Sequence, residues 1–166
     1  MTIGQRCGRG VSKMGTTKSG RYLNTRGSRY SPSEYAVVHS NEGTFTHRVK
    51  GGELRLKSGG HGQDGMDLLD KYGIAYNVVK TYANGVRVGN VPRHKNPRKR
   101  TGIAQAWFPK TWSAAAIKSA GKYVTHLKRN QGIGDGVTMI GTYRGVKVGV
   151  ILTNGQIGTI FPTSAQ

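Results

Sequence analysis

The chain is poor in acidic residues. Its 166 residues include seven Asp and Glu against 26 Lys and Arg, which gives a formal net charge of +19 and an isoelectric point near 10.6. Such an imbalance is typical of proteins that bind nucleic acid, an anionic membrane surface or an acidic protein. Composition alone therefore predicts a polyanionic partner, and it favours an RNA- or DNA-binding protein.

Cysteine and long apolar runs are scarce as well. Cys7 is the single cysteine, so an internal disulfide framework and a cysteine metal cluster are excluded. No apolar run approaches the ~20 residues that a membrane-spanning helix needs, and we expect no membrane partner. The first residues, MTIGQRCGRGVSKMG, lack the apolar core of a signal peptide. Export would need another route or a larger parent protein.

Large apolar residues are almost missing from the start of the chain. Gly, Ser, Thr, Lys and Arg dominate there, which predicts a basic flexible N-terminal arm over residues 1–34. The remainder, 35–166, is predicted to form one α+β domain with antiparallel sheets and a few helices. The elements expected are a short buried segment at 35–40, a helix at 66–73, strands at 74–82, 86–91 and 103–109, a helix capped by Thr111 or Ser113, and a C-terminal three-stranded meander.

Residues 92–100, PRHKNPRKR, form the most basic stretch of the predicted domain. Six of these nine residues are Arg, Lys or His, and two are Pro. The prolines exclude a continuous helix or a central strand, so the stretch is predicted to be an exposed loop. Concentrated positive charge repels itself unless an anion binds it. The cations expected to contact RNA phosphates are Arg93, Lys95, Arg98 and Arg100.

Two of the five histidines have neighbours that suit catalysis. His61 follows Gly59-Gly60 and precedes Gly62, and glycines let the backbone turn tightly and let a phosphodiester approach. His47 lies 14 residues earlier in a TFTH segment. An imidazole pKa near 6.5 suits both a general base and a general acid. We therefore predict that His47 and His61 cleave RNA together, and we expect His39 and His126 to be structural or merely exposed.

A metal site is the competing interpretation of the same stretch. His61, Asp64 and Asp67 are candidate ligands, but HGQDGMD has no established ligand spacing and the chain offers few other carboxylates. A GxSxG nucleophile elbow is absent from the sequence. We expect neither a metal nor another cofactor.

Five segments in order carry a family resemblance: THRVKGG, GGHG, NGVRVGNVP, WFPKTWS and GTYRGVKVGVILTNGQIGTIFP. Together they resemble the bacterial EndoU-type endoribonucleases, over about residues 40–162. Many members of that family are toxin domains at the C-termini of contact-dependent-inhibition and related polymorphic toxins. The resemblance implies an RNase A-like, EndoU-like fold and two catalytic histidines, which match His47 and His61.

The resemblance also implies a lysine that stabilises charge on the phosphate, and a late Thr/Ser-x-Tyr-Pro segment. Lys99 is the expected lysine; the alternatives are Lys95, His94 and Lys110. The late segment is Thr159-Ile160-Phe161-Pro162. Phe161 replaces the tyrosine, so the hydroxyl is absent, although its ring can stack on a base. Tyr143 is considered as another source of that hydroxyl.

The expected function is a metal-independent endoribonuclease toxin. It would cleave RNA, with tRNA as one candidate, to 2′,3′-cyclic phosphate and 5′-hydroxyl ends. The resemblance further implies an acidic immunity protein, and secretion or cell-surface delivery to the cytoplasm of a target cell. Two alternatives stay open: a non-catalytic nucleic-acid-binding module, and a toxin-type fold made inactive by Phe161.

Overall fold

The computed structural model describes residues 26–47 and 52–166. These residues form α-helices and small antiparallel sheets, which confirms the predicted α+β class. The elements in chain order are α1 (Glu34–Asn41), β1 (Thr44–Phe45), β2 (Leu56–Ser58), α2 (Gln63–Lys71), β3 (Asn77–Thr81), β4 (Arg87–Asn90), the 3-10 turn η1 (Pro97–Lys99), β5 (Gln105–Trp107), α3 (Ala114–His126), the 3-10 turn η2 (Lys128–Asn130), β6 (Met139–Tyr143), β7 (Val146–Thr153) and β8 (Gln156–Pro162).

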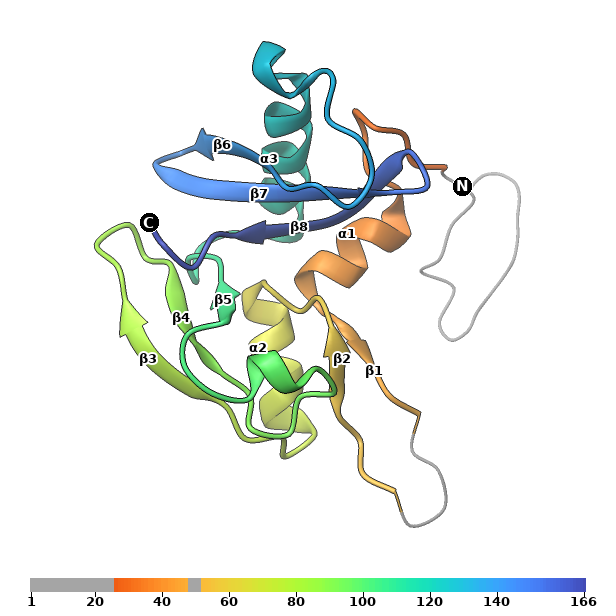
Figure 1. Ribbon diagram of the computed structural model, residues 1–166. Coiled ribbons are helices and arrows are strands. Elements are labelled where there is room, and N and C mark those ends of the chain that lie inside the picture. Colours follow the sequence, from red (N-terminus) through yellow and green to blue (C-terminus); the bar gives the residue numbers. More distant parts are fainter. Residues whose placement is uncertain (1–25, 48–51) are drawn as a thin grey trace, which may run out of the picture.

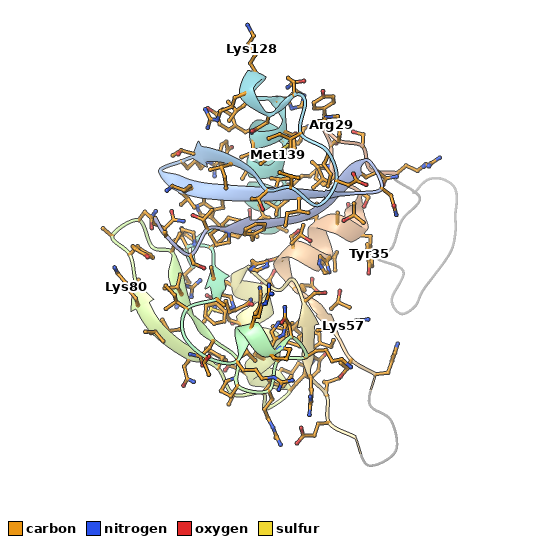
Figure 2. All side chains as sticks on the ribbon, viewed as in Figure 1. Arg29, Tyr35, Lys57, Lys80, Lys128 and Met139 are labelled. Carbon is orange, nitrogen blue, oxygen red and sulfur yellow. The ribbon has the colours of Figure 1, made fainter. Side chains whose placement is uncertain are left out.

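The C-terminal sheet is the predicted meander, with strand order β6-β7-β8 (Figure 1). Its two tight turns use Arg144-Gly145 and Asn154-Gly155, and all four residues have positive φ, as two-residue hairpin turns require. Helix α3 packs on this sheet, and Ser113 accepts the Ala116 N–H at its start. Figure 2 shows Met139 inside this half, whereas Lys80 and Lys128 extend from the periphery.

The second sheet has the order β3-β4-β5, so the Asn-Gly hairpin predicted around Asn84-Gly85 is present. Helix α2 contributes Met66 and Leu69 to a small core beside it, with Leu56 and the fully buried Trp107. Trp107 and its neighbour Phe108 thus pack in the core rather than offer an exposed stacking surface. Strand β3 lies at the edge of this sheet and is exposed along its length.

Helix α1 joins the two halves, and in Figure 1 it lies between β8 and the β1–β2 pair. The 35–40 segment, expected only to be buried, is thus helical. Ser33 caps the helix by accepting the Ala36 N–H. The Ser40 hydroxyl donates to the Ala36 carbonyl and accepts the Ile160 N–H at 2.9 Å. This fully buried serine fixes the end of α1 against β8.

The final residues of the predicted basic arm contact the domain. The Arg29 guanidinium donates to the Asn130 carbonyl at 3.0 Å, and the Ser28 carbonyl accepts the Ile157 N–H at 2.9 Å. Most of the predicted arm, residues 1–25, lies outside the described residues. Within the described part of the chain, no helix is long and apolar enough to cross a membrane.

Candidate active site

A cavity of about 370 Å³ opens between β8, β5 and the segments around His61 and His94. Three of the five histidines line it, together with two lysines. The lining residues are His39, Lys57, Ser58, Gly59, His61, His94, Asn96, Lys99, Ala104, Ala106, Ile151, Thr159, Phe161, Pro162 and Ser164. This lining contains no carboxylate, so its charge favours an anionic ligand.

His61 enters the cavity because the glycine segment lies along the last turn of α1. The N–H groups of Gly60, His61 and Gly62 donate to the carbonyls of residues 39, 40 and 41 at 3.0, 2.6 and 3.0 Å. Gly59 has φ +70°, and a Cβ there would lie 2.1 Å from the His39 carbonyl oxygen. Glycine is therefore required for this close approach of two backbones.

The His61 ring is held in one tautomer. Its Nδ1 lies 2.8 Å from the Ala106 carbonyl oxygen, which can only accept, so Nδ1 carries the proton and Nε2 keeps its lone pair. Burial, followed by the positive charge of Lys99, holds the pKa of His61 well below its usual value. His61 is thus a neutral imidazole at neutral pH, with a free lone pair on Nε2.

Of the two lysines in the lining, Lys99 is the less exposed. It ends η1, and its Nζ donates to the Gln105 side-chain oxygen at 3.0 Å. Burial lowers its pKa to about 8, so it is mostly charged at pH 7. Its charge lowers the pKa of His39, His61 and His94, which line the same cavity. The lysine expected from the resemblance thus lines the cavity with His61.

His94, an alternative for that cation, is neutral. It is 1% exposed, and its Nδ1 accepts the Asn96 N–H at 2.8 Å. Burial, then the charges of Lys99 and Arg100, lower the pKa of His94 to about 4. A protonated ring is therefore unfavourable at this position. Lys95 is exposed and Lys110 lies outside the lining.

His39, expected to have only a structural or surface role, lines the cavity. Its Nδ1 lies 2.7 Å from the Thr44 hydroxyl oxygen, and burial, then Lys99, lowers its pKa. The backbone carbonyl of His39 accepts the Gly60 N–H, so the 59–62 segment that carries His61 lies directly against His39. No local motif reveals such a contact, which is why sequence reasoning did not select His39.

The structure does not bring His47 to the cavity that His61 lines. His47 is exposed and lies two residues beyond β1. Thr44 pairs with Ser58 of the lining, but Phe45 pairs with Leu56 and the Thr46 N–H reaches the Arg55 carbonyl. Residues 45 and 46 thus pair with residues that do not line the cavity, and the next residues, 48–51, lie outside the described part.

Thr159 and Phe161 of β8 both line the cavity. The centroids of the Phe161 and His61 rings are 5.8 Å apart with a tilt of 43°. Tyr143 lies elsewhere: its ring packs against Trp112 and Tyr123, outside the lining. It therefore does not place its hydroxyl where the family tyrosine is missing.

The four loop cations predicted to bind RNA lie outside the lining, on the loop that supplies His94, Asn96 and Lys99. Arg93 forms an ion pair with Glu53, and the Arg100 Nε donates to the His94 carbonyl at 2.8 Å. Lys95 and Arg98 are exposed. Two of the four cations thus already have protein partners.

The family comparison agrees with the segments that carry the resemblance. The model for bacterial EndoU nuclease matches residues 33–164, which include every residue of the cavity lining. The chain belongs to this family. No curated protein and no solved structure matches it. Membership makes the chain an EndoU nuclease domain.

The carboxylates near His61 in this EndoU domain have protein partners. Asp64 accepts from the Asn41 side chain at 2.8 Å, and Asp67 accepts from Gln63 at 2.9 Å. The described residues contain no group of three or more His, Cys, Asp or Glu side chains placed to hold a metal ion.

Proposed function

We propose that this EndoU domain is an endoribonuclease whose 2′-hydroxyl transesterification produces 2′,3′-cyclic phosphate and 5′-hydroxyl ends. One observation carries the proposal: a neutral His61 with a free lone pair on Nε2 shares with Lys99 a cavity whose lining contains no carboxylate. Family membership supports the nuclease activity.

In this proposal His61 Nε2 removes the proton of the 2′-hydroxyl. The 2′-oxygen forms a bond to phosphorus, the bond from phosphorus to the 5′-oxygen breaks, and an acid protonates the leaving oxygen. Lys99 stabilises the negative charge that grows on the phosphate. Thr159 and Phe161 form the wall against which a nucleoside lies, with the Phe161 ring available for stacking.

A second histidine protonates the leaving oxygen. The family pattern offers His47 as the second histidine, without saying which of the pair is the acid, whereas the cavity itself contains His39, whose Nδ1 lies against the Thr44 hydroxyl. The two assignments rest on different evidence. Each predicts that a different variant, His39→Ala or His47→Ala, lacks the acid, so one experiment separates them.

The nuclease activity is tested with total RNA and folded protein in excess EDTA. We expect cleavage to cyclic phosphate ends, and a loss of about 10²-fold or more in His61→Ala, since general base catalysis contributes 10²–10⁴-fold. Intact RNA would instead support the non-catalytic binding module. Cleavage that EDTA stops would indicate a metal nuclease.

The acid is identified with an RNA that carries sulfur in place of the scissile 5′-oxygen. A thiolate leaves without protonation, so this substrate restores cleavage only to the variant that lacks the acid. His39→Ala and His47→Ala are compared, with His126→Ala as control because His126 is exposed on α3. His61→Ala should stay slow on both substrates.

We further propose a toxin role with tRNA as one candidate substrate, an acidic immunity protein as partner, and delivery into a target-cell cytoplasm. The net charge of +19 supports an acidic partner. Expression of the wild-type domain in a bacterial cytoplasm should stop growth, whereas expression of His61→Ala should not. Equal growth inhibition by both would contradict a toxicity that depends on cleavage.

A further inference from the structure

The proton of the neutral His94 ring has a defined position. Its Nδ1 lies 2.8 Å from the Asn96 backbone nitrogen. A backbone N–H can only donate, so Nδ1 must accept and the single ring proton sits on Nε2. His61 has the opposite arrangement, because a carbonyl faces its Nδ1. Two neighbouring imidazoles thus present opposite groups: a lone pair on His61 and an N–H on His94.

The Nε2–H of His94 has no hydrogen-bond partner in the described part of the chain, although it is buried. A buried donor without a partner is destabilising, and native structures seldom retain one without a reason. The other buried unpartnered side-chain atoms found there belong to Arg29, Arg87 and Trp107, none of which lines the cavity. His94 does line it, beside Lys99.

Besides the bond to Nδ1 of the ring, the backbone of His94 is held in place. The backbone N–H of His94 donates to the Val91 carbonyl at 2.8 Å, and the His94 carbonyl accepts from the Arg100 Nε at 2.8 Å. The Lys95 N–H donates to the Leu56 carbonyl of β2. A donor fixed in this way needs no reorganisation when charge develops on its ligand, which is the property of an oxyanion-binding group.

We propose that His94 Nε2–H donates a hydrogen bond to a non-bridging oxygen of the scissile phosphate, beside the Lys99 ammonium. This inference rests on the proposed function. A phosphate oxygen is the acceptor that suits both an uncharged N–H and an adjacent cation. His94 keeps its proton throughout and acts as a fixed donor, whereas His61 exchanges one. Because its pKa is about 4, His94 remains neutral around pH 7.

The test uses short RNAs with one non-bridging oxygen of the scissile phosphate replaced by sulfur, as separate Rp and Sp diastereomers. Sulfur is a poorer acceptor, so one diastereomer should be cleaved slowly by the wild-type protein. His94→Phe keeps a buried ring but has no donor. It should cleave the all-oxygen RNA about 10²-fold more slowly, the loss typical of one oxyanion donor, and it should lose most of the discrimination between diastereomers.

Two further variants separate contact with the phosphate from a structural role. His94→Gln retains an N–H donor and should keep part of the discrimination. Asn96→Ala keeps the backbone N–H that binds Nδ1 but removes the side-chain cap of η1; it should leave the ratio of diastereomer rates unchanged. An unchanged ratio in a folded His94→Phe would overturn the inference while leaving the nuclease proposal intact.

A binding measurement does not depend on cleavage. NMR of the imidazole nitrogens should show the Nε2–H tautomer of His94, and this signal should shift when an RNA with a 2′-deoxy substitution at the cleaved position is added. The signal could shift although the wild-type protein cleaves no RNA. In that case the proposed reaction fails and His94 is still a phosphate ligand. No shift at saturating RNA would contradict the contact.

Discussion

Single backbone contacts decide the chemistry of the cavity residues. A carbonyl at Nδ1 leaves the lone pair of His61 on Nε2, an N–H at Nδ1 leaves the proton of His94 on Nε2, and burial brings the pKa of Lys99 down to about 8. The sequence pointed to His61 through its glycines and to Lys99 through the family resemblance. It could not assign protonation states, because these depend on groups such as Ala106, 45 residues from His61.

The lowered pKa of Lys99 predicts a limit to activity in alkaline solution. Above about pH 8 the ammonium loses its proton, so the phosphate loses its cation and kcat/KM should fall about tenfold per pH unit. Lys99→Arg keeps its charge and should not show this fall. The measurement is kcat/KM from pH 6 to 10 for both proteins. An identical alkaline limb in Lys99→Arg would assign the titration to another group.

The lowered pKa of His94 predicts a loss of stability in acid. Its pKa is about 4 in the folded protein and 6.5 in the unfolded chain. As the pH falls from 6.5 toward 4 the unfolded chain takes up more protons, so the free energy of unfolding decreases, by roughly 3 kcal/mol from this residue. Burial of His61 acts in the same direction.

Urea unfolding at several pH values between 7.5 and 4 measures this effect. His94→Phe has no group to titrate there, so its free energy of unfolding should fall less steeply with pH than that of the wild type. Parallel curves for the two proteins would show that His94 does not contribute to the acid dependence.

At the scale of elements, the site depends on the docking of the 59–62 segment against the end of α1. The hairpins were predictable, because Asn84-Gly85 and Asn154-Gly155 are local turn signals. Helix α1 was not predicted: it has eight residues, and its segment was recognised only as buried. Its C-terminal turn nevertheless positions His39, and it accepts the three backbone hydrogen bonds that place His61.

Gly59→Ala tests this docking. The new Cβ would meet the His39 carbonyl oxygen, so the backbones must separate, and we expect a loss of at least about 2 kcal/mol in unfolding free energy together with reduced cleavage. Gly155→Ala is the matched control: φ is +74° there, but nothing lies within 4 Å of the added Cβ. It should cost about 1 kcal/mol and leave cleavage intact. Equal costs would show that the close approach is unimportant.

At the scale of the whole molecule, the positive charge is distributed widely. Exposed lysines occur on α2, on α3 and on the edge strand β3, and Figure 2 shows Lys80 and Lys128 at separate extremities. The net charge of +19 therefore attracts polyanions to the whole surface rather than to one site. Specific binding is expected where exposed cations adjoin the cavity, as Lys95 and Arg98 do on the loop of Lys99.

The salt dependence of RNA binding distinguishes the exposed cations beside the cavity from the lysines spread over the rest of the surface. Lys95→Ser combined with Arg98→Ser should reduce the slope of log K against log salt for single-stranded RNA by about 1.4, since each phosphate contact contributes roughly 0.7. Lys71→Ser combined with Lys122→Ser removes the same charge from α2 and α3 and should change the slope little. Affinity is measured with a 2′-deoxy substitution at the cleaved position. Equal slopes for both double variants would indicate diffuse binding only.

The sequence by itself determined the α+β class, the hairpins and the EndoU family, because turn residues, alternating patterns and ordered motifs are local properties. It also selected His61 and Lys99 as candidate site residues. The tertiary structure decided which histidines share the cavity: His39 lines it with His61, whereas His47 is not among the lining residues. It also decided which ring nitrogens carry protons. Both outcomes depend on backbone groups distant in sequence, which become neighbours only when the chain folds.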